Sequence, residues 1–178
     1  MDETQEALTQ LCKACGLCCT GRLFIWAKLR PAELDPAEAL GMTVFRSDPT
    51  QRGFGHPCPL WQGQCTIYET PHYPKVCRAY TCNVFDEVQA QKIPLTRALT
   101  IIEEAKILFR EVEALLPASS NPNFRERFVH YLETEEDPAH SNEADQGLHS
   151  KAEALMFVYE KVFGVKDLLE KPAEDEFL

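Results

Sequence analysis

Eight cysteines in the first half of the chain are the residues best suited to chemistry. Four lie within the eight-residue stretch CKACGLCC, at Cys12, Cys15, Cys18 and Cys19. The other four are Cys58, Cys65, Cys77 and Cys82. The acidic start MDETQEALTQL lacks the basic and apolar regions of a signal peptide, so we expect a cytoplasmic protein. In a reducing compartment, clustered thiols are more often metal ligands or redox groups than structural disulfides. We therefore expect these cysteines to hold metal.

The spacing of the first cysteines favours an iron–sulfur cluster and leaves zinc open. Cys12, Cys15 and Cys18 form C-x2-C-x2-C, the spacing with which bacterial ferredoxins place three thiolates around one cluster. A remote Cys-Pro supplies a further ligand in those proteins, and here Pro59 follows Cys58. Zinc usually takes two paired C-x2-C turns, but the later cysteines are spaced C-x6-C, C-x11-C and C-x4-C.

Cys18 and Cys19 are adjacent, which limits how they can share a metal. In an extended chain, successive side chains point to opposite sides. We therefore do not expect both thiols to bind one ion in the ordinary way. The eight thiols could make two sites of four cysteines, or one site with extra cysteines in redox or packing roles.

A few other side chains near the cysteines could take part. His56 and His72 are candidate ligands, and Arg78 is a cation that could stabilise thiolates. Tyr68 and Tyr80 could shield the site or donate hydrogen bonds to sulfur. The sequence contains no P-loop, G-x-G-x-x-G, G-x-S-x-G or H-E-x-x-H motif. No catalytic acid–base pair can be assigned.

The length and charge of the chain limit which classes of partner we expect it to bind. The chain has 178 residues, 44% of them hydrophobic, which is enough for one domain with a core. Residues 1–93 carry a net charge of −1 and residues 94–178 a net charge of −9. An acidic chain is not expected to bind nucleic acid, which needs a basic footprint. Apolar runs such as Leu23–Ala27 are too short to span a membrane, so a protein partner is the class that stays open.

The hydrophobic pattern divides the chain into a cysteine-rich metal-binding region, 1–93, and a helical region, 94–178. In the second region it predicts helices over 94–116 and 123–134 and after Ser150, with Gly164 as the last cap and the acidic stretch 133–147 as a loop. In the first region it predicts helices over 3–11 and 36–40 and from Pro74, a strand over 23–27 and a loop over 46–64. The expected fold is mainly α with irregular segments. The cysteine-rich half packs on about three C-terminal helices in one compact body, and a metal closes the loop between Cys19 and Cys58.

Several linked motifs resemble those of one known family. They are C-x2-C-G-x-C-C at Cys12–Cys19, C-P-L at Cys58–Leu60, C-x-I-Y-E at Cys65–Glu69 and P-x-x-C-R-x-Y-x-C at Pro74–Cys82. Together they resemble the CxxCxxCC, or YkgJ, family of zinc- or iron-chelating domains over roughly residues 10–85. Tyr73 stands where that family usually has arginine. The resemblance implies a metal-binding domain. A flagellin lysine methylase is similar to the same family, which keeps an enzymatic role open, although no methyl-donor fingerprint is seen here.

Three functions follow from these observations. The first is a cytoplasmic metal-binding protein whose thiolates hold an iron–sulfur cluster or zinc. The second is a modifying or redox enzyme that uses the centre and needs an open coordination position or a substrate pocket. The third is a thiol redox or metal-trafficking protein with an exposed, reactive Cys18–Cys19 pair.

Overall fold

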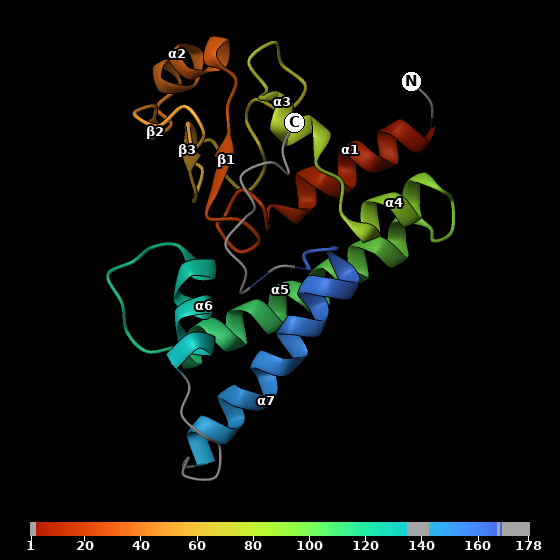
Figure 1. Cartoon of the computed structure of the whole chain (residues 1–178). Helices are drawn as coiled ribbons and strands as arrows, with labels where there is room; N and C mark the ends of the chain where they lie inside the picture. Colours follow the sequence, from red (N-terminus) through yellow and green to blue (C-terminus); the bar gives the residue numbers. More distant parts are fainter. Residues whose placement is uncertain (1–2, 135–142, 167, 169–178) are drawn as a thin grey trace.

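The fold is mainly helical, as predicted (Figure 1). The computed structural model describes residues 3–134, 143–166 and 168. Its helices are α1 (Glu3–Cys15), α2 (Pro31–Ala39), α3 (Lys75–Ala79), α4 (Asn83–Gln89), α5 (Leu95–Leu115), α6 (Phe124–Thr134) and α7 (Glu143–Phe157), followed by a π-helical turn, Val158–Val162. The strands β1 (Trp26–Lys28), β2 (Val44–Phe45) and β3 (Gly53–Gly55) form an antiparallel sheet in the order β1-β3-β2.

Most of the core surrounds α5. One face of this helix buries Ala98, Ile102, Ala105, Phe109 and Val112, which recur at steps of three and four residues. Helices α1, α4 and α7 contact it (Figure 1). We call α1, α4–α7 and the π-helical turn the helical part.

Aromatic rings fill the centre of the helical part. The ring of Phe109 lies 5.3 Å from that of Phe124 and 5.4 Å from that of Tyr159. Phe128 stacks between Phe124 and Tyr159, with centroids 5.8 and 6.0 Å away. Such pairs contribute about 0.5–1.5 kcal/mol each beyond the burial of their area. The C-terminal helices are thus held on α5 by large, fully buried side chains.

A second, smaller core lies between the sheet and α2, which together we call the sheet part. It consists of Leu29, Leu34, Ala37, Met42 and Phe54. Helix α2 begins at Pro31, where the missing N–H costs nothing. One oxygen of Glu33 accepts the N–H of Arg30 at 2.9 Å, and the other accepts the N–H of Lys75 at 2.8 Å. Glu33 therefore caps α2 and ties it to α3.

Many hydrogen bonds join the two regions of the sequence, among them those of Asn123 and Tyr80. The amide of Asn123, buried at the start of α6, donates to the carbonyls of Phe24 at 3.3 Å and His56 at 3.2 Å. The hydroxyl of Tyr80 donates to the carbonyl of Phe163 at 2.8 Å. The core around α5 also includes apolar residues of α1 and α4. The division into 1–93 and 94–178 stays a prediction.

Several element boundaries differ from the prediction. The helices expected over 94–116 and 123–134 are confirmed, with observed bounds of 95–115 and 124–134, and Gly164 ends the last turn with φ +72°. The first helix extends to Cys15, the expected strand is shifted to 26–28, and the helix expected over 36–40 begins at Pro31. The loop expected over 46–64 contains β3, and α4 was not predicted. The last long helix begins at Glu143 and not after Ser150, so it takes up the end of the loop expected over 133–147, of which 135–142 lie outside the described residues. The reason is that short strands and helices depend on distant partners more than on local pattern.

None of the helices in the described residues is long and apolar enough to cross a membrane.

Candidate metal centre

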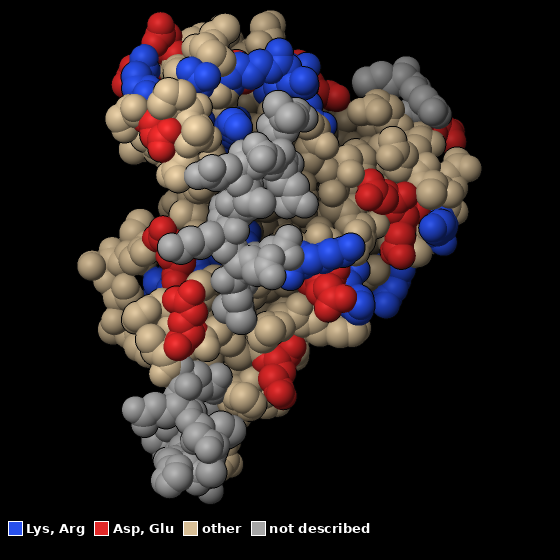
Figure 2. All heavy atoms as spheres, in the orientation of Figure 1, with Lys and Arg blue, Asp and Glu red and all other residues tan. Residues whose placement is uncertain are grey.

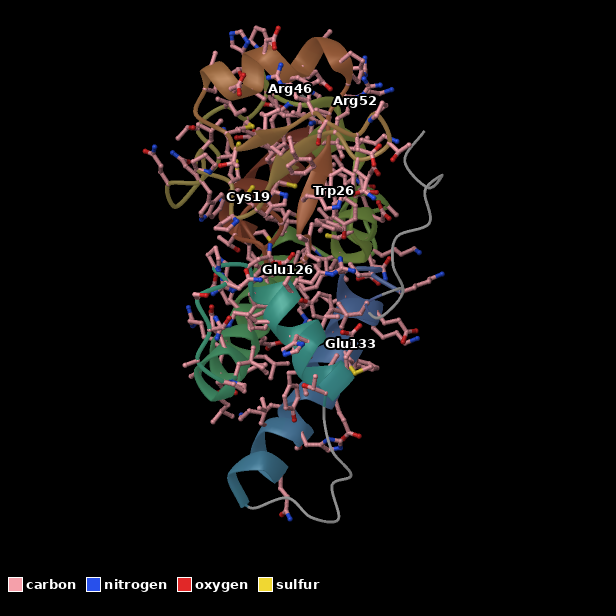
Figure 3. All side chains as sticks on the ribbon, turned by 60° about the vertical axis from the view of Figure 1, so that its left-hand side comes forward. Cys19, Trp26, Arg46, Arg52, Glu126 and Glu133 are labelled. Carbon is pink, nitrogen blue, oxygen red and sulfur yellow. The ribbon has the colours of Figure 1, made fainter. Side chains whose placement is uncertain are left out.

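A cavity of about 620 Å³ brings all eight cysteines together, and the sheet part and the helical part both line it. In Figure 3, Cys19 and Trp26 lie at the lower end of the sheet, above the helices. The thiols come from α1, the turn after it, the segment after β3, α3 and the start of α4. Residues far apart in the sequence therefore meet in one place.

Gly16 shapes the first cysteine cluster. Cys12 and Cys15 lie three residues apart in the last turn of α1, so they are neighbours on one face. Gly16 then takes a φ of +69°, which favours glycine, and a Cβ added there would lie 2.1 Å from the ring of Trp61. The chain turns back as the N–H of Thr20 donates to the Gly16 carbonyl at 2.9 Å. The glycine of the C-x2-C-G-x-C-C motif thus ends the helix and makes room for Trp61.

Backbone contacts position the later cysteines against the first cluster. The N–H of Cys58 donates to the carbonyl of Cys19 at 2.7 Å. Trp61 and Cys65 form an antiparallel bridge that closes the loop between them. The hydroxyl of Tyr73 donates to the carbonyl of Cys77 at 3.0 Å.

The thiols divide into two groups according to which neighbours raise their pKa. Cys12, Cys15 and Cys82 all raise the pKa of Cys18, whereas Cys58, Cys65 and Cys77 all raise that of Cys19. We call Cys12, Cys15, Cys18 and Cys82 the Cys18 group, and Cys19, Cys58, Cys65 and Cys77 the Cys19 group. The adjacent cysteines Cys18 and Cys19 thus lie in different groups, although the segment that carries them is a turn and not an extended strand. The two groups also interact with each other, because Cys19 raises the pKa of Cys18 and Cys15 raises that of Cys19.

Burial is the largest cause of raised pKa values throughout the cavity. It raises the pKa of Cys15 to about 11 and those of Cys12 and Cys77 to about 12, and it raises those of Cys18 and Cys19 further. Without metal, these thiols are therefore protonated at neutral pH. Among the residues that the structure describes, no three Cys, His, Asp or Glu side chains already form a metal-ligand set. Binding would have to remove the thiol protons and draw the sulfurs of a group together.

In each group, backbone hydrogen bonds and a nearby lysine favour the thiolate form of the cysteines. Backbone N–H groups two and three residues further along donate to Cys58, Cys65 and Cys82, and the one two residues further along donates to Cys15. Each of these bonds lowers the thiol pKa because it stabilises the charged form. Lys106 lowers the pKa of Cys15, and Lys13 lowers that of Cys65. The donor set therefore fits a thiolate-bound metal in each group.

The two tyrosines have different partners. The hydroxyl of Tyr68 hydrogen-bonds the thiol of Cys12 and lowers its pKa, as expected of a donor to sulfur. The hydroxyl of Tyr80 instead donates to the carbonyl of Phe163, and its ring packs edge-on against Phe24 at 4.8 Å. Tyr80 thus joins the cavity wall to the C-terminal helices.

The two histidines also differ. His56 lines the cavity against Phe54, with ring centroids 5.1 Å apart. Burial lowers its pKa to about 4, and its Nδ1 has no hydrogen-bond partner among the described residues. His72 is exposed and lies outside the residues that line the cavity. His56 is therefore the histidine that could assist at the site.

Arg78 does not stabilise the thiolates, and that prediction is wrong. Its guanidinium is exposed and donates to the carbonyls of Thr70 at 2.6 Å and Tyr73 at 3.2 Å. It also lies 5.4 Å from the centre of the Tyr73 ring. Arg78 thus stabilises the loop before α3, while Lys13 and Lys106 lie near the thiols.

The sequence did not mark Trp26, Trp61, Lys106 or Arg125 as functional residues. Trp26 and Arg125 line the cavity, Trp61 packs on Gly16, and Lys106 donates to the carbonyl of Ala14 at 2.6 Å. Each acts through a long-range contact, which no local pattern reveals.

Residues 11–98 match the model of the CxxCxxCC family, which is described as "Putative zinc- or iron-chelating domain". This segment is a CxxCxxCC domain. It contains every thiol of both groups and extends through α4 into the first turn of α5. No curated protein and no solved structure matches the chain. The CxxCxxCC domain supports zinc or iron binding as the class of function.

Proposed function

We propose that the CxxCxxCC domain holds two metal centres side by side, one in the Cys18 group and one in the Cys19 group. The observation that carries this proposal is the division of eight thiols into two sets of four around one cavity. Four thiolates are a complete ligand set for a tetrahedral zinc ion or for an iron–sulfur cluster.

Iron–sulfur clusters are the first choice for these centres. The Cys18 group combines the C-x2-C-x2-C spacing with a remote fourth cysteine, Cys82, and Cys18 is the most deeply buried of the eight thiols. Iron–sulfur clusters would supply one-electron chemistry, whereas zinc would chiefly stabilise the fold. In either case the free energy of binding also stabilises the long loop between Cys19 and Cys58.

Metal analysis tests which element is bound. The protein is purified without oxygen, and iron, zinc and acid-labile sulfide are measured per chain beside a visible spectrum. Iron with sulfide and an air-sensitive brown colour supports the clusters. Colourless protein with two zinc ions per chain supports the zinc alternative. Purified protein that contains neither iron nor zinc would refute the proposal.

Paired serine variants test the grouping. Cys18→Ser and Cys19→Ser should each remove about half of the bound metal, because each breaks one set of four ligands. Cys18→Ser with Cys82→Ser stays within one group and should remove no more than Cys18→Ser alone. Cys18→Ser with Cys77→Ser affects both groups and should remove nearly all the metal. Equal losses in the two double variants would contradict the grouping.

The cavity gives some support to the second function, a modifying or redox enzyme. Its volume of about 620 Å³ is within the usual range for sites that bind small molecules, and His56 lines it beside the thiols. An enzyme of this kind needs an open coordination position. A changed EPR spectrum of the reduced centre on addition of cyanide would indicate one, and an unchanged spectrum would count against it.

The third function, a reactive thiol pair, has less support. Cys18 and Cys19 are both partly buried, and burial raises the pKa of both. Thiols that stay protonated are poor nucleophiles. The cytoplasmic location, a protein partner, and the exclusion of nucleic acid and membrane as partners remain predictions from composition.

A further inference from the structure

The charged residues that line the cavity are all basic. They are Lys28, Arg125 and Lys166, and no Asp or Glu of the described residues lines it. The whole chain has the opposite balance, with 28 acidic and 18 basic residues. On the face shown in Figure 2, Lys and Arg side chains also form a band over the sheet part. Apart from the thiols and tyrosines, the ionisable lining of the cavity is therefore basic in an acidic protein.

These cations are distinct from those that act on the thiols. Lys13 lowers the pKa of Cys65, Lys106 lowers that of Cys15, and neither lysine lines the cavity. Lys106 is also tied to Glu103 at 2.8 Å. Neither Lys28 nor Lys166 forms an ion pair with another described residue. The charges of Lys28 and Lys166 thus remain available to a ligand.

Aromatic side chains lie beside these cations. Trp26 and Lys28 are two residues apart on β1, so they share one face of the strand, and both line the cavity. The guanidinium of Arg125 donates to the carbonyl of Leu23 at 2.6 Å, next to Phe24. Phe24 packs on Tyr80, which donates to the carbonyl of Phe163, three residues before Lys166.

We propose that this wall of the cavity binds an organic anion with an apolar or aromatic body. The cations would bind its carboxylate, sulfonate or phosphate group, and the rings of Phe24, Trp26 and Tyr80 would pack against its body. The cavity of about 620 Å³, which this molecule would share with the metal centres, is within the usual range for sites that bind small molecules. The proposal goes beyond metal binding, because the cations and rings that carry it are not metal ligands and do not depend on which metal the thiols hold, although they line the same cavity as the thiols.

Two fluorescent probes with the same ring system test the proposal on the full-length protein as purified. One is 8-anilinonaphthalene-1-sulfonate, an anion, and the other is N-phenyl-1-naphthylamine, which lacks the sulfonate. Binding is measured by titration of probe fluorescence. Energy transfer from tryptophan locates the bound probe, because Trp26 lines the cavity.

Lysine variants separate charge from apolar contact. We expect Lys28→Gln with Lys166→Gln to weaken binding of the anionic probe about tenfold and to leave the neutral probe unchanged. The matched control is Lys75→Gln with Lys92→Gln, which changes net charge equally at two exposed residues that do not line the cavity. An unchanged urea midpoint for each variant would show that the fold is retained.

Three results would overturn the proposal. The first is equal affinity of the anionic probe for the wild type and the cavity variant. The second is equal weakening in the cavity variant and the control. The third is unchanged energy transfer in Trp26→Phe, which would place the probe elsewhere. Loss of metal from the cysteine variants with probe binding retained would show that the two sites are separate.

Discussion

Replacing Gly16 with alanine is the sharpest test of how the first cysteine cluster is built. Gly16 has a φ of +69°, and an added Cβ would lie 2.1 Å from Cζ2 of Trp61. Carbon atoms in contact prefer about 3.5–4.0 Å, so the ring or the backbone would have to move. The change would disturb the contact between the end of α1 and the loop that carries Cys58 and Cys65.

Two costs add up in this variant. An alanine in the left-handed region costs about 1–2 kcal/mol. Forcing a methyl group into an occupied position costs a further ~1–3 kcal/mol. We therefore expect Gly16→Ala to lower the free energy of unfolding by about 2–5 kcal/mol. Gly41 is the matched control, because its φ is +87° and nothing lies within 4 Å of an added Cβ. Gly41→Ala should cost about 1–2 kcal/mol, the backbone cost alone.

The assay is urea denaturation of the reduced, metal-free protein, followed by far-UV circular dichroism. Trp61→Leu should remove part of the clash, so Gly16→Ala should cost less in that background than in the wild type. Equal destabilisation by Gly16→Ala and Gly41→Ala, together with no coupling to Trp61→Leu, would refute the contact between Gly16 and Trp61.

Three further predictions follow from the cavity and its supports. Burial raises the pKa of Cys12 to about 12, so the folded, metal-free protein keeps its thiol protons above pH 9, where the unfolded chain loses them. Its stability should be full below about pH 9 and fall as the pH rises towards about 12; a urea midpoint at about pH 10 no lower than that at about pH 8 would contradict this sign. Asn123→Ala removes hydrogen bonds to the carbonyls of Phe24 and His56, which flank the sheet, and should lower the free energy of unfolding by about 1–3 kcal/mol. Thr134→Ala, an exposed change on α6, should have little effect in the same urea assay. Tyr68→Phe removes a hydrogen bond to the Cys12 thiol and should weaken metal binding in a competition titration with a chelator. Tyr80→Phe loses only a hydrogen bond to a backbone carbonyl, so it should lower the free energy of unfolding by about 0.5–1.5 kcal/mol and leave metal affinity unchanged. Equal metal affinities in the two tyrosine variants would argue against the contact between Tyr68 and sulfur.

The sequence by itself determined the helical half and the metal-binding class. The apolar residues of α5 recur with the period of a helix over 21 residues, so local pattern was sufficient to predict it. The linked cysteine motifs identified the family, because their spacing is written directly in the chain. The strands have three residues or fewer and exist only through pairing with one another, so their positions could not be read locally.

Only the tertiary structure decided which thiols meet. The sequence was compatible with either one metal site or two. The packing of α1 and α4 on each other and on α5 brings Cys82 to the first three cysteines of the motif. It likewise turned Arg78 away from the thiols and gathered Lys28, Arg125 and Lys166 from three distant segments into one cavity. The physical reason is that spacing fixes only which side chains are neighbours along the chain. Neighbours across the cavity depend on how buried apolar faces pack.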